Sequence, residues 1–136
     1  MTISSLLAPL TPLAMLRPWP RYEVDAATWD AIGAALGQGE GELMALWAEP
    51  TQVHLALRAP ELTNPGIVSL AATNKSFPSI GRYHAPALRP ERAIRDLYGL
   101  TPAGIPDARA WLDHGAWDVA APLGARNPSP ARDPAD

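Results

Sequence analysis

The sequence predicts one α/β domain of the α+β kind: an antiparallel sheet with helices packed on one face, followed by an irregular C-terminal strap. Between residues 43 and 73, three short apolar runs are separated by turn residues, which is typical of strands. Amphipathic stretches with helical spacing lie before and after these runs. The chain has 136 residues, 47% of them hydrophobic, which is enough to bury one core.

The composition excludes several classes of protein. The net charge is −3, and no cluster of basic residues indicates nucleic acid or a lipid surface as a partner. The chain has no cysteine, which excludes disulfides, thiolate-bound iron–sulfur clusters and cysteine nucleophiles. The apolar stretch Met1 to Leu16 is interrupted by prolines and follows no positive charge, so we expect neither a signal peptide nor a membrane span. We therefore expect a cytoplasmic protein.

The N-terminal region is predicted to be an extended, proline-rich arm over residues 1–20, either loose on the domain or ordered by a partner. A helix follows over residues 25–37. Asp25 is its expected N-cap, and Gly37 its expected end. Apolar residues at helical spacing give this helix one buried face: Trp29, Ile32 and Leu36.

The predicted sheet begins with a hairpin of strands 43–48 and 51–58, which the turn signal Glu49-Pro50 joins. In the second strand Val53, Leu55 and Leu57 alternate with more polar residues, so one face is covered and the other is more polar. A third strand is predicted over 67–73. A short edge strand over 77–82 contains Pro78.

A second helix is predicted over residues 90–98, with Pro90 at its first position and Gly99 at its end. Glu91 and Arg95 have the spacing of an ion pair on a helix. Residues 101–118 are expected to be irregular, and the part from Gly104 to Trp117 is the C-terminal strap. Residues 124–136 are expected to form a disordered tail, so the domain extends over 21–123.

The sequence contains few residues in patterns typical of catalysis or metal binding. The three histidines, His54, His84 and His114, are isolated from other metal ligands, so we expect no metal site. No glycine-rich loop joins a strand to a helix in the pattern that binds phosphate. An independent small hydrolase or lyase using Asp107, His114 or Glu91 remains an alternative. For the charged residues 91, 92, 95 and 96, spacing alone favours a solvated helix face with ion pairs over acid–base chemistry.

An ordered set of motifs over residues 77–123 resembles the 30-kilodalton subunit family of respiratory-chain NADH dehydrogenase (complex I). It also resembles the related N-terminal domain of membrane-bound [NiFe]-hydrogenase and formate hydrogenlyase large subunits. The matching residues are Pro78-Ser79, Glu91-Arg92, Asp96-Leu97-Tyr98-Gly99, Gly104, Pro106-Asp107, Arg109, Asp113-His114, Trp117 and Pro122-Leu123. Ala93 and Ile105 stand where the family has Glu and His, which implies an altered partner surface.

The resemblance implies a non-catalytic structural subunit that binds no cofactor. Such a subunit docks on the large subunit, 49-kilodalton-like or [NiFe]-hydrogenase-like, of an NADH:quinone oxidoreductase or related hydrogenase. It reaches the inner face of the cell membrane only through its partners. A free-standing adaptor that kept the domain but lost the complex is the alternative. The predicted partner-binding residues are Glu91, Arg92, Arg95, Asp96, Tyr98, Gly99, Gly104, Pro106, Asp107, Arg109, Trp111 and Trp117.

Overall fold

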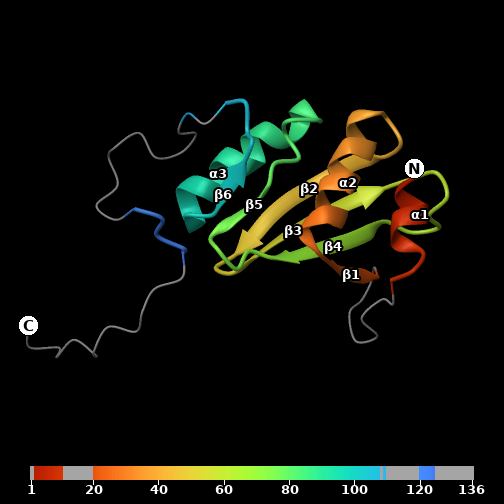
Figure 1. Cartoon of the computed structure of the whole chain (residues 1–136), viewed down its shortest axis with the longest axis horizontal. Helices are drawn as coiled ribbons and strands as arrows, with labels where there is room; N and C mark the ends of the chain where they lie inside the picture. Colours follow the sequence, from red (N-terminus) through yellow and green to blue (C-terminus); the bar gives the residue numbers. More distant parts are fainter. Residues whose placement is uncertain (1, 11–19, 108, 110–119, 125–136) are drawn as a thin grey trace, which may run out of the picture.

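The computed structural model describes residues 2–10, 20–107, 109 and 120–124 and shows a mixed α/β domain (Figure 1). A four-stranded sheet forms its centre, and a small two-stranded sheet lies beside it. In chain order the elements are α1 (Ile3–Leu7), β1 (Arg21–Val24), α2 (Ala26–Gly37), β2 (Glu42–Glu49), β3 (Gln52–Arg58), β4 (Gly66–Ala71), β5 (Ser76–Pro78), a 3₁₀ turn (Ala85–Ala87), α3 (Leu88–Tyr98) and β6 (Thr101–Ala103).

The central sheet has the strand order β1-β4-β3-β2. The predicted hairpin of β2 and β3 and the third strand β4 are confirmed as antiparallel neighbours. The prediction of a wholly antiparallel sheet is wrong, because β1 pairs in parallel with β4. Four residues with the polar-apolar pattern of β1 give too weak a strand signal on their own. The strand exists because the open edge of β4 supplies its hydrogen bonds, beginning with Ile67 N–H donating to Pro20 O at 2.9 Å.

One face of the sheet carries the core, as predicted. Val53, Leu55 and Leu57 are fully buried, and Val68 and Leu70 are at most 5% exposed. They belong to one apolar cluster to which both long helices contribute, namely Trp29, Ile32 and Leu36 from α2 and Ile94 from α3. The alternation in β3 therefore identified the core face correctly.

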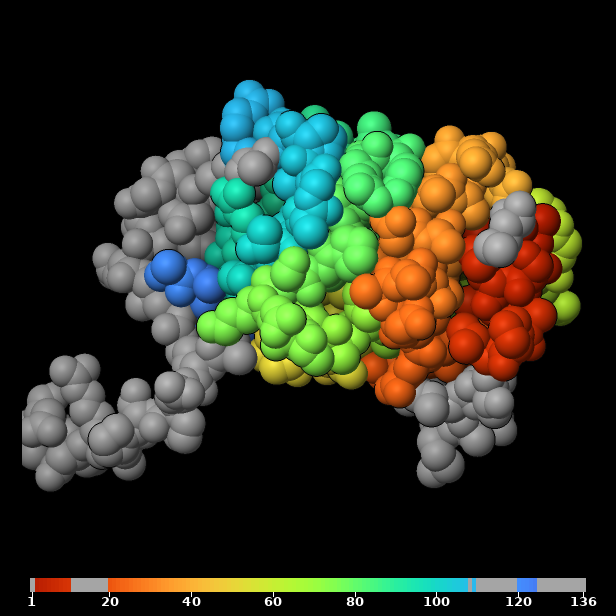
Figure 2. Space-filling model, viewed as in Figure 1, coloured from red at the N-terminus to blue at the C-terminus, as the bar shows by residue number. Residues whose placement is uncertain are grey.

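The N-terminal residues are a helix rather than part of an extended arm. The Thr2 side chain caps α1 by accepting a hydrogen bond from Ser5 N–H at 3.1 Å. Ile3 and Leu7, one helical turn apart, are buried and join the core. Figure 2 shows α1 lying against α2 on the face turned toward the reader. The prolines that suggested extended structure begin at Pro9, after the helix has ended, and residues 11–19 lie outside the described residues.

The two long helices begin and end close to the capping residues that the sequence predicts. Asp25 accepts a hydrogen bond from Thr28 N–H at 2.8 Å, which confirms it as the N-cap of α2 and lowers the pKa of its carboxyl. Gly37 stays inside the helix, and the left-handed residue beyond the end is Gly39, with φ +79°. Gly99, with φ +72°, ends α3 as predicted.

Helix α3 begins two residues earlier than predicted, so Pro90 occupies its third position rather than its first. The helix tolerates proline there because the first four N–H groups of any helix lack an intrahelical acceptor. No helix in the described part of the chain is long and apolar enough to cross a membrane.

A second, two-stranded sheet joins the start of the strap to the rest of the domain. The strand predicted over 77–82 is shorter in the structure, where β5 ends at Pro78. Strand β6 lies in a stretch predicted to be irregular. The two strands are parallel, and Ser79 N–H extends the pairing by donating to Ala103 O at 2.9 Å. Each strand has three residues, too few to produce a recognisable alternation in the sequence.

Candidate docking surface

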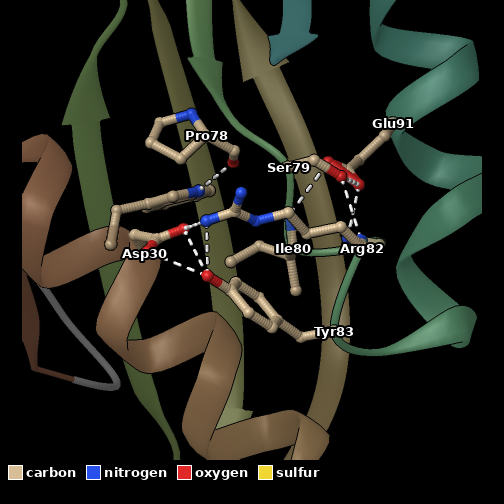
Figure 3. Close-up of polar contacts among 9 residues, drawn as sticks. Asp30, Pro78, Ser79, Ile80, Arg82, Tyr83 and Glu91 are labelled. Atoms are coloured by element: carbon tan, nitrogen blue, oxygen red, sulfur yellow. Dashed lines mark hydrogen bonds and ion pairs between the residues drawn. The ribbon is translucent and has the colours of Figure 1, made fainter. Parts of the chain in front are cut away.

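Glu91 lies inside the domain, although the sequence predicts it on a docking surface. Its carboxylate is fully buried and accepts hydrogen bonds from Ser79 Oγ (2.8 Å), Ile80 N–H (3.1 Å) and Gly81 N–H (2.6 Å) (Figure 3). The predicted ion pair between Glu91 and Arg95 is therefore wrong, and Arg95 Nε instead lies 4.0 Å from Asp96 Oδ1. Glu91 holds the loop that follows β5 against α3.

That loop, residues 79–83, also reaches α2. Arg82 Nη2 lies 2.7 Å from Asp30 Oδ1, and the Tyr83 hydroxyl donates to Asp30 Oδ2 at 3.0 Å. The hydrogen bond to Asp30 raises the pKa of Arg82. In Figure 3 the side chains of these three residues converge between α2 and the loop. The 79–83 loop therefore joins α2 to α3.

Two opposing influences determine the protonation of Glu91. Burial disfavours the charged carboxylate and raises its pKa to about 7, although the hydrogen bonds from Gly81, Ser79 and Ile80 act in the other direction. The ionised form accepts all three donors without reorganisation. The protonated form must turn its O–H toward an acceptor, and the Ser79 hydroxyl oxygen is the available one. Near neutral pH, both forms of Glu91 are populated.

A second polar cluster lies on the outside of α3. Arg109 pairs with the Asp107 carboxylate through both Nε (2.9 Å) and Nη2 (2.8 Å). Arg92 on α3 donates from Nε to Arg109 O at 2.6 Å and places Nη1 3.4 Å from Asp107 Oδ2. The side-chain hydrogen bonds from Arg109 hold the pKa of the Asp107 carboxyl well below its usual range. Arg92 therefore fastens the strap to the helix.

Arg109 remains accessible within this cluster. Its side chain is 81% exposed, compared with 27% for Asp107 and 11% for Arg92. Hydrogen bonds to the Asp107 carboxylate fix the direction of the Arg109 guanidinium, and they also raise the pKa of Arg109. A cation held in one direction on the surface loses less conformational entropy on binding than a mobile one.

The other predicted docking residues have varied surroundings. Asp96 is buried, and Tyr98 is half-buried and packs against the core. Gly99 and Gly104 supply left-handed backbone at two turns, and Pro106 is exposed between Gly104 and Asp107. The chain returns to α3 at residues 120–124, where Leu123 N–H donates to Leu97 O at 2.7 Å. Trp111 and Trp117 lie outside the described residues.

The structure thus brings together one part of the predicted set and separates another. Arg92, Asp107 and Arg109 form a cluster, while Glu91 points into the domain and Asp96 is buried. The sequence does not reveal that Asp30, Arg82 and Tyr83 hold the 79–83 loop, because no spacing rule relates residues 52 or 53 positions apart. For Ser79 the sequence does indicate importance, because Ser79 belongs to the motif set that resembles a known family.

The described ranges contain no evident metal centre. No group of three or more His, Asp or Glu side chains there is placed to hold a metal ion. The groups bonded to Glu91 are a hydroxyl and two backbone amides, so this carboxyl has no histidine partner for acid–base chemistry. A cavity of about 550 Å³ between the loops 39–42 and 58–65 shares no residue with the predicted docking set.

Comparisons with known proteins agree with this architecture. The family model described as "Respiratory-chain NADH dehydrogenase, 30 Kd subunit" matches residues 45–132. A chain of the membrane-bound sulfane sulfur reductase, an archaeal respiratory membrane complex, superposes with a TM-score of 0.58 at 12% identity, covering 89% of this chain and 78% of that one. The trypsin-resistant fragment of Nqo5 has a TM-score of 0.58 at 14% identity, covering 77% of this chain and 95% of the fragment. No curated protein sequence matches significantly.

Proposed function

Since this chain belongs to the family of the 30-kilodalton subunit of respiratory-chain NADH dehydrogenase, we propose that it is a non-catalytic structural subunit that docks on the large subunit of a membrane-associated redox complex. The partner is a 49-kilodalton-like or [NiFe]-hydrogenase-like chain. Its cofactors carry the redox chemistry, and this chain contributes position and binds no cofactor of its own. Contact with the membrane is indirect, on its cytoplasmic side.

The cluster on α3 and the strap is the observation that carries the proposal. Arg92 and Asp107 fix the strap, and Arg109 is left exposed and oriented by a two-point pair with Asp107. A surface of this kind suits orientation and registration of a partner more than raw affinity. Trp111 and Trp117 are proposed as the aromatic anchors of the same surface, because buried aromatics dominate the binding energy of many interfaces.

Substitution of Arg109 by alanine is expected to weaken recovery of the large subunit at least several-fold while leaving the fold unchanged, since the side chain is 81% exposed. The experiment is co-purification of the tagged full chain from its host, with folding checked by thermal melting. Arg58→Ala is the matched control, because Arg58 is also exposed but lies at the end of β3. Trp111→Ala tests the proposed anchor separately.

The docking proposal fails if Arg109→Ala and Trp111→Ala both fold normally and recover every partner as well as the unmodified chain. Loss of partners from Arg58→Ala to the same extent would also count against it, because the effect would then not be specific to the strap.

A further inference from the structure

The sheet has a second face, opposite the core, and β2 and β3 present a defined group of residues there. Leu46 and Ala48 of β2 are buried in the core cluster. Trp47 and Glu49 alternate with them and therefore point to the opposite face. Across the β2–β3 ladder, Trp47 lies opposite His54 and Glu49 opposite Gln52.

A chain of buried and partly buried hydrogen bonds runs beneath Trp47 and ends at Glu49. His54 is only 3% exposed, with Nδ1 2.7 Å from Ser69 Oγ and Nε2 2.8 Å from Glu49 Oε2. Ser69 Oγ accepts from Arg21 Nε at 2.7 Å, and Arg21 Nη2 donates to Gln52 Oε1 at 3.3 Å. This network connects β1, β4, β3 and β2 across the whole sheet.

The network fixes the state of His54. Burial lowers the pKa of His54, although the hydrogen bond to Glu49 acts in the other direction, so burial favours the neutral ring. A carboxylate only accepts, so the single ring proton lies on Nε2 and is donated to Glu49. Nδ1 then accepts the hydroxyl hydrogen of Ser69, whose oxygen is already engaged by Arg21.

The same network orients the two exposed residues. The Trp47 indole packs over the His54 ring at 5.6 Å between centroids and 30° between planes, and Trp47 remains 38% exposed. The Glu49 side chain is 59% exposed and gives one oxygen to His54. An aromatic surface and a carboxylate, each already held in position, therefore lie two residues apart on one strand.

We propose that Trp47 and Glu49 form a binding site for an arginine side chain of a partner protein. Residues two apart on a strand are separated by about 6.5 Å, which lets one planar guanidinium lie on the indole while its N–H groups reach the carboxylate. Lysine fits less well, because its ammonium is a compact point charge without a flat face. A neutral His54 beneath the indole adds no positive charge that would repel the guanidinium.

The charges around the site favour a cationic occupant. Glu49 supplies this charge directly, and Glu23, opposite Ser69 in the β1–β4 ladder, is a second exposed carboxylate on the same face, at the other edge of the sheet. The nearby cation, Arg21, is already engaged with Ser69 and Gln52. This site lies on β2, apart from the strap and α3, so it goes beyond the docking surface proposed above and does not depend on it.

The test is a titration of the purified, ¹⁵N-labelled full chain with the blocked peptide acetyl-Gly-Arg-Gly-amide, followed by NMR. The lysine peptide of the same length is the ligand control. Glu49→Gln removes the charge but keeps an oxygen that accepts from His54. Trp47→Leu removes the aromatic surface. Glu61→Gln, an exposed acid in the β3–β4 loop, is the matched protein control.

We expect the arginine peptide to shift the indole N–H of Trp47 and the backbone amides of residues 47–49, and the lysine peptide to shift them several-fold less. Glu49→Gln and Trp47→Leu should each abolish the response, and Glu61→Gln should preserve it. Absence of these shifts in the unmodified chain, equal responses to both peptides, or an undiminished response in Glu49→Gln would overturn the proposal. Self-association of the chain that Trp47→Leu abolishes would instead identify a second copy as the occupant and also overturn it.

Discussion

Replacing Glu91 with alanine is expected to lower the free energy of unfolding by about 3–5 kcal/mol, among the largest effects of any polar substitution in this domain. The change leaves the N–H groups of Ile80 and Gly81 buried without an acceptor, and it also removes the acceptor of the Ser79 hydroxyl hydrogen. It frees the 79–83 loop from α3 as well. Urea denaturation followed by circular dichroism measures the effect, and a loss below about 1 kcal/mol would contradict this account.

The glutamine variant separates charge from shape. Glu91→Gln keeps one oxygen that accepts hydrogen bonds, but its NH₂ group faces a donor in place of the second oxygen. We expect it to be less stable than the unmodified chain and more stable than Glu91→Ala at pH 7. Asp30→Asn is a useful control, because it weakens the exposed attachment of the same loop to α2 and should cost about 1 kcal/mol or less.

Glu91 also makes stability depend on pH, in the direction opposite to that of most carboxyls. Its pKa is about 7 in the folded protein against an ordinary value of 4.5, so between these pH values the folded state holds more protons. Stability from this group is therefore fully present below pH 4.5, falls as pH rises, and is lost above pH 7, a total of about 3 kcal/mol.

His54 opposes this trend, because a lowered pKa makes stability rise with pH up to the ordinary value of 6.5. The effect of Glu91 is therefore the difference between the unmodified chain and Glu91→Gln, measured from pH 5 to pH 8. The two profiles should converge as pH rises across this range. Parallel profiles would show that the Glu91 carboxyl does not titrate there.

Replacing Trp29 with alanine is the second large effect, an expected loss of about 3–5 kcal/mol in the free energy of unfolding. Trp29 is fully buried, its Nε1–H donates to Pro78 O at 3.0 Å, and its ring meets Phe77 edge-on at 6.4 Å. The substitution opens a cavity between α2 and β5 and leaves a carbonyl without its donor.

Trp29→Phe is the control that separates these two contributions. It retains most of the buried apolar area and loses only the hydrogen bond to Pro78 and part of the volume, so we expect a smaller loss, about 1–2 kcal/mol. Thermal melting with van't Hoff analysis compares the two variants. If Trp29→Phe is as destabilising as Trp29→Ala, the hydrogen bond rather than packing dominates at this position.

The features predicted well from the sequence are local or periodic. Asp25 and Gly99 mark helix ends because capping depends on a few adjacent residues. The core face of β3 follows from alternation, which has the same period as the side chains of any strand. The family match over residues 45–132 agrees with the resemblance drawn from an ordered set of short motifs.

The features predicted poorly depend on partners distant in the chain. A glutamate between arginines on an amphipathic helix is expected to be exposed. Glu91 is buried because a loop ten residues earlier supplies three donors to it. The alternation in β3 places His54 on the more polar face, opposite Val53 and Leu55, and the structure confirms that placement. Its burial could not be predicted, because it depends on Ser69 and Arg21, which reach it from β4 and β1.

The sequence by itself therefore determined the fold class, the core face of the sheet and the family. Periodicity, capping residues and motif order depend only on residues that are close together or in a fixed order in the sequence. Only the tertiary structure decided which charged residues are accessible. Arg109 is exposed and Glu91 buried, although both were predicted to contact a partner. The physical reason is that exposure of a polar side chain depends on whether distant backbone and side-chain groups satisfy it, and no local pattern in the sequence encodes those distances.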